Sequence, residues 1–372
     1  MSTIFTDEQQ ILRESVRKFA QTEVAARAVE IDQTDEFPDD LYQRCIELDL
    51  LGLPVPVEYG GMGADLKTEA IVMEEIGKVC PALALTLDVH YFAETQILGL
   101  GTEEQKRKFL PDMVSGKKLG GVSNTDASGT ANMSEWAVGC VREGDFYRVN
   151  TSKVFQTSCS KSGIIILTVM AEGGTKKLIV DREESPGVNA GELENKMGLR
   201  GSDTGTLNYD DVLVPVANEL FDRPMKYSDA PMIDVSAICM GIAEASVDIT
   251  RKYLQKRSHG GKPIIGINQI PIELAKMLTT IEVMRGFLAT AEEDFDNDVP
   301  LLTRGYMAKS WCSEEAAMIA HTCIEMCGAV GYSEDTGLTR RLRDAEGFRI
   351  AEGATNTMRA ITALFNGIMA SL

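Results

Sequence analysis

Apolar residues recur every three or four positions along the first third of the chain. Ile11, Leu12 and Val16 show this spacing, which continues for several helix lengths. A period of three to four residues places such side chains on one face of a helix. The pattern predicts an all-helical N-terminal domain over residues 1–117, in which a last short helix ends before Pro111.

The pattern changes at Lys118. Short runs rich in β-branched residues, such as 163–169 and 177–180, alternate with Gly, Asn, Asp and Ser. Runs of this kind, with no long helix between them, are typical of a small β-barrel or sandwich. We expect a middle β-barrel domain over residues 118–224.

The helical period returns at about Pro231 and persists to Leu372. A polar stretch over 294–300 separates two long helices, and the Gly-containing stretch 328–332 makes a second break. These features predict a C-terminal helical bundle over residues 225–372. The expected fold class is mainly α with a central β domain.

Composition excludes several classes of protein. The formal net charge of −19 argues against binding to nucleic acid or to an anionic membrane surface, because both need basic patches. The chain has no long apolar run and no basic segment followed by an apolar one at its start, so we expect no membrane span and a cytoplasmic protein. The eight cysteines lack paired CxxC spacing and the three histidines are far apart, which predicts free thiols and no metal site.

A lone carboxylate stands beside a glycine near the C-terminus. Glu352 precedes Gly353, and Thr355 or Asn356 could cap a helix that follows. A helix N-terminus favours the ionised carboxylate, whereas burial in an apolar pocket raises its pKa towards that of a usable base. By itself, Glu352 is better explained as a solvated residue at a helix start than as a general base.

Five separated motifs occur along the chain. They are 59–63 with 103–106, 153–158, 194–204, 257–263, and Arg343-Asp344 with Glu352-Gly353. In this order they resemble the motifs of the flavin-dependent acyl-CoA dehydrogenases, and the resemblance covers essentially the whole chain. It implies FAD bound between the middle β domain and a C-terminal four-helix bundle, and a homotetrameric assembly.

The resemblance implies roles for residues of the middle domain. Phe155 would lie beside the isoalloxazine ring of FAD, and Thr157 would form a hydrogen bond near its N5 atom. Asn124, Gly129 and Thr130 occupy positions of a turn that, in this family, meets the flavin and its pyrophosphate.

The resemblance also implies roles for residues of the C-terminal domain. Arg257, Asn268 and Gly328 match positions that reach the FAD of a neighbouring subunit, and Glu352 matches the catalytic base. Glu352 would remove the α-proton of an acyl-CoA thioester, while its own main-chain N–H and a flavin hydroxyl stabilise the enolate oxygen. The β-hydrogen would leave as a hydride to flavin N5, and the electrons would pass to an electron-transfer flavoprotein.

Some positions depart from the family's pattern. Asn124 begins a segment that replaces Thr-Glu-Pro, Gly260 replaces an aromatic residue, Glu325 replaces Gln, and Ala354 replaces Thr. These changes weaken the expected contacts with FAD.

The expected acyl pocket also departs from the pattern. Ala351 stands where many relatives carry Tyr, which leaves room for a bulky, cyclic or aromatic acyl group. Asp88 and His90 fall in the helix that lines the deep end of the pocket in this family. They are either solvated or paired helix residues, or Asp88, alone or with His90, recognises a polar group or removes a second proton from a ring. Leu83 lies about where glutaryl-CoA dehydrogenases carry an arginine, which disfavours a dicarboxylic substrate.

The sequence therefore supports FAD-dependent dehydrogenation of an acyl-CoA thioester as the main hypothesis. The same machinery can run in reverse as an enoyl-CoA reductase, and an acyl-CoA oxidase that uses oxygen would also retain Glu352. A non-enzymatic binding or assembly role is the alternative from a different class, suggested by the altered FAD positions.

Overall fold

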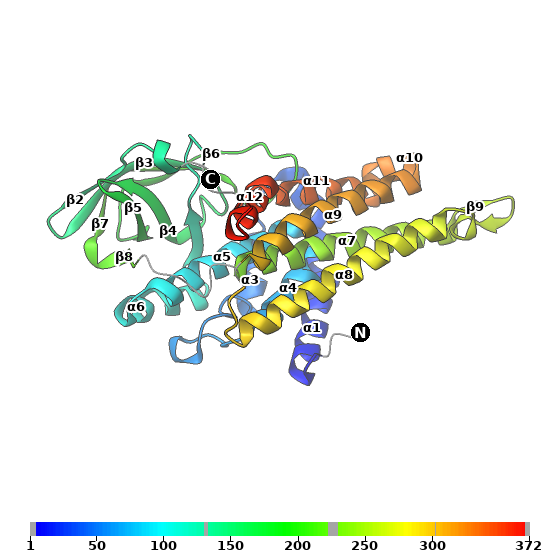
Figure 1. The fold of residues 1–372 in the computed structure, drawn as a ribbon, viewed down its shortest axis with the longest axis horizontal. Coiled ribbons are helices and arrows are strands. Elements are labelled where there is room, and N and C mark those ends of the chain that lie inside the picture. The colour runs from blue at the N-terminus through cyan, green and yellow to red at the C-terminus, as the bar shows by residue number, and fades with distance from the viewer. Residues whose placement is uncertain (1–4, 130–132, 222–229, 302, 369–372) are drawn as a thin grey trace.

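A computed structural model describes residues 5–129, 133–221, 230–301 and 303–368. Figure 1 shows a group of N-terminal helices, a β domain at one end of the molecule, and long C-terminal helices. The order of helical, β and helical parts predicted from the sequence is confirmed.

The N-terminal part is helical. Its main elements are α1 (Asp7–Phe19), a π-helical turn (Ala20–Val24), α2 (Ala25–Thr34), α3 (Asp39–Glu47), α4 (Leu66–Gly77), α5 (Pro81–Leu100) and α6 (Glu103–Val114), and α5 is its longest helix. Thr6 with Gln9 and Thr102 with Gln105 form capping boxes at the starts of α1 and α6. Each box satisfies main-chain N–H groups that the first turn of a helix leaves without a partner.

Helix α6 continues past Pro111, so the prediction that it ends before this residue is wrong. Proline removes one N–H, whose acceptor in a regular helix would be the carbonyl of Arg107. Arg107 is exposed, so water can take the place of the missing hydrogen bond.

The middle part is one sheet of eight strands. They are β1 (Leu119–Ser123), β2 (Cys140–Glu143), β3 (Phe146–Gln156), β4 (Ser162–Ala171), β5 (Gly174–Asp181), β6 (Val188–Leu193), β7 (Gly205–Pro215) and β8 (Glu219–Leu220). Neighbouring strands follow the order β6-β7-β3-β2-β4-β5-β8, and β1 pairs with β4 in parallel.

The sheet does not close into the barrel that the sequence predicts. Within the described residues, no pairing joins β6 to β8, which are the two ends of the strand order. Strand β8 has two residues, and β6 shifts register against β7 beyond Ala190, so neither end offers a regular row of hydrogen bonds for closure.

The C-terminal part consists of long helices and a small hairpin. Its elements are α7 (Ala230–Lys256), β9 (Ser258–His259), β10 (Lys262–Pro263), α8 (Ile270–Asp296), α9 (Arg304–Cys327), α10 (Ala329–Tyr332), α11 (Leu338–Phe348) and α12 (Thr355–Phe365). Figure 1 places the β9–β10 hairpin and α10 at the end opposite the β domain, and α12 at the end of the bundle nearest to it.

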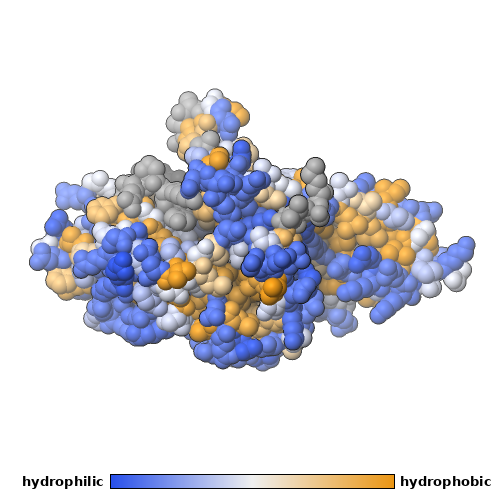
Figure 2. All heavy atoms as spheres, turned by 90° about the horizontal axis from the view of Figure 1, so that it is seen from below, coloured by the Kyte–Doolittle hydropathy of each residue, from blue (hydrophilic) through white to orange (hydrophobic). Residues whose placement is uncertain are grey.

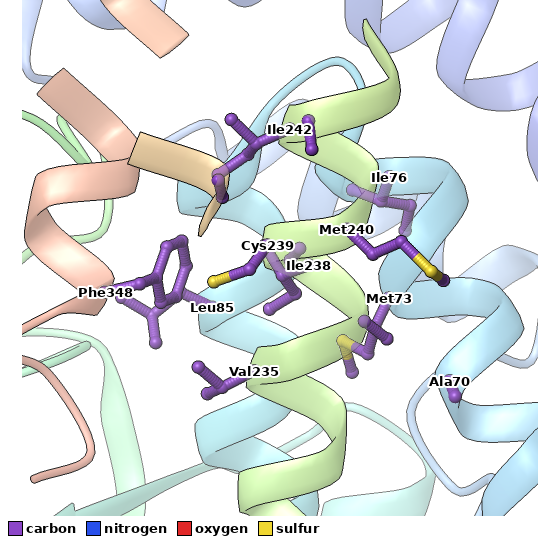
Figure 3. Packing of buried hydrophobic residues seen from close by; sticks show 14 of the residues in the cluster. Ala70, Met73, Ile76, Leu85, Val235, Ile238, Cys239, Met240, Ile242 and Phe348 are labelled. Carbon is purple, nitrogen blue, oxygen red and sulfur yellow. The ribbon is translucent and has the colours of Figure 1, made fainter. Parts of the chain in front are cut away.

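Helix α7 lies at the centre of the main hydrophobic core. It packs against α4, α5, α8, α9 and α11, and its first half is therefore buried on all sides. Figure 3 shows Cys239 of α7 pointing towards Leu85 of α5 and Phe348 of α11, while Met240 points towards α4. Because Phe348 is the last residue of α11, this packing holds the segment that leads into Glu352.

All eight cysteines are buried free thiols, as the sequence predicts. A search of the described helices finds none with the length and apolar character needed to cross a membrane. Figure 2 shows apolar residues gathered over the long C-terminal helices. On α8, the exposed large hydrophobic residues are Ile272, Leu278 and Val283.

Candidate active site

Glu352 lies in the tight loop 349–354 between α11 and α12. Its backbone is left-handed, with φ of 53°, and Gly353 follows with φ of 100°. This φ at residue 353 is one that residues with a Cβ atom rarely adopt, so the turn favours glycine. A hydrogen bond of 3.0 Å from Thr355 N–H to Arg349 O closes the loop. A left-handed glutamate is strained, and such strain is common at functional sites.

The helix after the loop begins without a side-chain cap. Helix α12 starts at Thr355, and Ala354 is its N-cap residue. The prediction that Thr355 or Asn356 caps this helix is wrong, because both residues already belong to its first turn.

The Glu352 side chain is half-buried. Burial raises the pKa of its carboxyl group, and the positive charge of Lys309 opposes that rise. In the part of the chain that the structure describes, the Glu352 main-chain N–H has no acceptor and is free to donate. A carboxylate with a raised pKa beside a free donor can act as a general base next to an oxyanion.

Helix α9 holds the loop from two sides. Lys309 is fully buried, and its Nζ donates a hydrogen bond to Gly353 O. On the outer side, Glu314 binds Arg359 of α12, with one N–O distance of 2.8 Å, and lies 4.0 Å from Arg349 Nη2. The segment that carries Glu352 is therefore attached to α9 both inside and at the surface.

The Arg343-Asp344 pair fixes α11 against two other parts of the chain. Arg343 forms two hydrogen bonds of 2.7 and 2.6 Å with Asp32 of α2. Asp344 accepts a hydrogen bond of 2.7 Å from Leu199 N–H, between β6 and β7. Burial raises the pKa of Asp344 to about 6, although the Leu199 N–H favours its charged form. This motif positions the helix that precedes Glu352.

Two buried carboxyl groups, Asp88 of α5 and Asp234 of α7, lie on the inner side of the site. Both are at most 2% exposed. Neither oxygen of Asp88, nor Oδ1 of Asp234, has a hydrogen-bond partner among the described residues. Burial raises the pKa of Asp88 well above its usual range, and the charges of Glu352 and Asp234 raise it further. Asp88 therefore binds its proton more tightly than an exposed aspartate does, and it interacts electrostatically with Glu352.

His90 is engaged elsewhere, so the structure does not bring it together with Asp88. Its Nδ1 accepts a hydrogen bond of 2.8 Å from Gly120 N–H, and its Nε2 lies 3.3 Å from Glu94 Oε1. Residues two positions apart on a helix do not face each other. Of the other two proposed pocket residues, Ala351 directly precedes Glu352 and is half-buried, and Asp88 interacts electrostatically with Glu352.

A fourth buried carboxyl group gives a prediction for stability. Burial raises the pKa of Glu292 of α8 from 4.5 to about 8, with an opposing effect from Lys67. Because the folded state holds this proton more tightly than the unfolded state, stability falls as pH rises from about 4.5 to about 8. Glu292→Gln removes the free-energy cost of ionising this buried group. At pH 8 we therefore expect its melting temperature to exceed that of the native protein, and its free energy of unfolding to be higher by up to roughly 5 kcal/mol.

The comparison that checks this prediction is a series of thermal melts from about pH 5 to pH 8. Glu293→Gln is the control, because Glu293 is the exposed neighbour of Glu292. A stability gain in Glu292→Gln that does not change with pH would contradict the assignment.

The β domain presents an exposed aromatic ring. Phe155 is 61% exposed and left-handed, with φ of 53°, where the pairing of β3 with β7 shifts register. Thr157 follows and is half-buried. A β-bulge re-aims a side chain out of a sheet, and here it turns a large apolar ring towards solvent. That ring can stack on a planar aromatic ligand.

The turn 126–129 lies next to this strand. Asn124 Oδ1 accepts a hydrogen bond of 2.6 Å from Thr168 Oγ1. Gly129 N–H bonds to Asp126 O at 2.8 Å, and Gly129 O accepts from Trp136 Nε1 at 2.7 Å. The Gly129 main chain is thus used within the protein, and Thr130 lies outside the described residues.

Arg257, Asn268 and Gly328 lie far from the other candidates. All three are exposed, and they flank the β9–β10 hairpin and the start of α10. Figure 1 shows these elements at the end opposite the β domain. One chain therefore does not bring these residues together with Phe155 and Thr157.

Sequence reasoning missed Asp234 and Lys309. Asp234 is the one charged residue in the stretch 230–243 of α7, and Lys309 is the one charged residue in the stretch 305–313 of α9. A charged group at a core position of a helix is rare unless it is paired or functional, and that was the available signal.

The chain is similar to known proteins over nearly its full length. Residues 6–117 match the family model described as acyl-CoA dehydrogenase, N-terminal domain, and residues 233–364 match acyl-CoA dehydrogenase, C-terminal domain. The chain is 33% identical to a probable acyl-CoA dehydrogenase of Bacillus subtilis (strain 168), over 98% of this chain and 99% of that protein. It is 31% identical to an acryloyl-CoA reductase (NADH) of Anaerotignum propionicum, over 98% of this chain and 95% of that protein.

The fold is similar to that of solved structures. Butyryl-CoA dehydrogenase from Megasphaera elsdenii superimposes with a TM-score of 0.92 at 28% identity, over 98% of this chain and 99% of that chain.

Proposed function

Because the chain belongs to the acyl-CoA dehydrogenase family of oxidoreductases, we propose that it is an FAD-dependent dehydrogenase of a CoA thioester, with Glu352 as its base. The observation that carries this proposal is the loop at Glu352. It presents a carboxyl group of raised pKa, with a free main-chain N–H, on a strained turn held by α9 and α11.

The residues of the β domain fit a flavin. The exposed Phe155 ring offers a flat apolar surface, and the half-buried Thr157 hydroxyl follows it. FAD, when bound there, would accept the hydride that leaves the β-carbon of the thioester. The Gly129 N–H is already bonded to Asp126 O, so the contacts to the pyrophosphate come from other groups or from a rearranged turn.

Glu352 performs the proton transfer in this proposal. Its carboxylate removes the α-proton, and its main-chain N–H donates to the thioester oxygen as that oxygen becomes negative. The product is the α,β-enoyl thioester. The base is kept in one orientation by the positioning residues Arg343, Asp344 and Gly353. A fixed orientation of base and substrate is the source of most of the rate advantage.

The test uses the purified, flavin-loaded protein without oxygen. A panel of saturated straight-chain, aromatic and alicyclic acyl-CoA esters is added, and the flavin absorbance is followed. Bleaching by at least one ester supports the proposal, and rapid reoxidation by air would then favour an oxidase. Absence of bleaching with every ester would refute dehydrogenation of these substrates.

We propose that the acyl group is bulky, cyclic or aromatic. Ala351 places a small, half-buried side chain next to Glu352, and Asp88 supplies a buried carboxyl group of raised pKa without a hydrogen-bond partner among the described residues. Such a group can donate to a polar substituent or exchange a second proton with a ring.

Asp88→Asn tests this role. We expect the rate of flavin reduction by an alicyclic ester to fall about 100-fold, because proton transfer contributes roughly that much or more, while a straight-chain ester changes little. Stopped-flow absorbance measures both rates. An equal fall with both esters would show that Asp88 only supports the fold.

Reduction of an enoyl-CoA is the second candidate function. The relative from Anaerotignum propionicum is named acryloyl-CoA reductase (NADH) and matches almost the full chain, which favours this possibility. In this direction Glu352 would return a proton to the α-carbon. Reoxidation of the reduced flavin by an enoyl-CoA, faster than its reduction by the saturated ester, would support the reductase.

We further propose an electron-transfer flavoprotein as the electron acceptor and a homotetramer as the assembly. The apolar side chains Ile272, Leu278 and Val283 of α8 support an assembly through the long helices. The remote positions of Arg257, Asn268 and Gly328 are consistent with a site that a second chain completes.

A further inference from the structure

Lys309 is a buried charged residue that the proposed reaction does not explain. It lies in α9 and is 0% exposed. Burial lowers the pKa of its ammonium group to about 8, although Cys239 and Glu352 both favour the charged form. A protein seldom keeps an ammonium group in its core without a carboxylate bonded to it, so its retention here calls for a cause other than stability.

The contact of Lys309 is with the loop that holds the candidate base. Its Nζ donates to the carbonyl of Gly353, the residue directly after Glu352. Both residues are left-handed, so this carbonyl is oriented by a turn that an ordinary chain would not adopt without support. A hydrogen bond from a charged donor to a carbonyl is among the stronger ones in proteins, and it therefore can hold such a turn.

The charge of Lys309 also acts on Glu352 itself. Around Glu352, the described titratable groups that interact are Lys309 of α9 and Asp88 of α5, and Asp88 in turn interacts with Asp234 of α7. Cys239 of α7 faces Lys309. Burial raises the pKa of both Asp88 and Asp234 well above the usual range, so both hold their protons more tightly than exposed carboxyl groups do. Among the described residues, Lys309 is then the cation that opposes the rise in the Glu352 pKa that burial causes.

We propose that Lys309 is a positioning residue of this site, which holds the Glu352–Gly353 turn through the Gly353 carbonyl and places a positive charge next to Glu352. This inference rests on the proposed role of Glu352 and extends it. The two effects of Lys309 are separable, because a neutral donor can replace the hydrogen bond and not the charge.

Two variants separate them. Lys309→Gln retains a hydrogen-bond donor without a charge, and Lys309→Met removes both. We expect kcat to fall about 10- to 100-fold in Lys309→Met, because a displaced base costs rate rather than affinity, with KM nearly unchanged. In Lys309→Gln the fall in kcat should be smaller than in Lys309→Met. In both variants the acid limb of the pH profile of kcat should move to higher pH, since the cation that favours ionised Glu352 is gone.

A second readout does not depend on turnover. Infrared titration of the unliganded protein follows the carboxyl band of Glu352, which is identified by its loss in Glu352→Gln. We expect this band to titrate at higher pH in Lys309→Gln and Lys309→Met than in the native protein. If Glu352→Gln remains fully active, the proposed function fails, while the infrared titration still decides whether Lys309 sets the ionisation of Glu352.

Thermal melts give the third readout. The pKa of Lys309 is about 8 in the folded protein and 10.5 ordinarily, so the folded state gains stability as pH rises through that window. This gain should be missing in Lys309→Met and Lys309→Gln, whose melting temperatures should therefore not rise with pH between about 8 and 10.5.

Lys117→Met, a change at an exposed lysine in the α6–β1 connection, serves as the control and should leave all three readouts unchanged. Should Lys309→Met fail to fold, Lys309→Gln alone decides the outcome. The proposal is overturned if the folded Lys309 variants keep the native kcat, pH profile and Glu352 titration.

Discussion

Replacement of Glu352 by Gln is expected to lower the rate of flavin reduction by an acyl-CoA by roughly 10²- to 10⁴-fold, the range in which a positioned general base contributes. Glutamine has nearly the same shape and retains the main-chain N–H, so the thioester should still bind. Single-turnover absorbance gives the rate, and a titration of the flavin spectrum gives the affinity.

The control for this variant is Glu293→Gln, which changes an exposed carboxylate of α8 that is distant in sequence from the site. It should reduce flavin at the native rate. If Glu352→Gln also does so, another group takes the proton, and Asp88 becomes the first candidate because it lies within electrostatic reach of Glu352.

Replacement of Gly198 by Ala is expected to destabilise the protein by about 3 kcal/mol, the upper part of the range for overpacked sites. The added Cβ would lie 2.2 Å from Arg343 O and 2.3 Å from Arg343 C. These are main-chain atoms of α11, so relief requires movement of the helix that leads into Glu352. The melting temperature and the flavin-reduction rate should therefore fall together.

Gly286→Ala is the matched control, because residue 286 lies within α8 and a Cβ there meets no atom within 4 Å. Alanine is the better helix former, so this variant should be as stable as the native protein or slightly more so. An unchanged melting temperature for Gly198→Ala would mean that α11 and the segment between β6 and β7 are less tightly joined than their contacts indicate.

Much of the fold follows from the local sequence. The spacing of apolar residues predicts the order of helical, β and helical parts. Thr6 predicts the start of α1, because its capping box involves only residues close to it in sequence. Closure of the sheet could not be predicted in the same way, since it depends on whether β6 and β8, which are distant in sequence, meet and pair. The prediction that α6 ends before Pro111 was wrong because the free-energy cost of a proline inside a helix depends on whether water can reach the carbonyl one turn earlier.

The candidate site shows the same division. Glu352 and Gly353 form a local pattern that the family resemblance places at the base. Lys309 and Asp234 come from α9 and α7 and meet the site only through tertiary packing. The sequence suggested that His90 acts together with Asp88. In the structure His90 instead contacts Gly120 of strand β1 and Glu94 on the next turn of α5.

The most direct test of Glu352 as the α-proton base is hydrogen exchange at the α-carbon of a thioester that has no β-hydrogen. Flavin-loaded native protein and Glu352→Gln are each incubated with 3,3-dimethylbutyryl-CoA in D₂O, and mass spectrometry measures the deuterium gained. The native protein should exchange the α-hydrogens, and Glu352→Gln should exchange them no faster than buffer does. Equal exchange in the two proteins would contradict the assignment of Glu352 as the base.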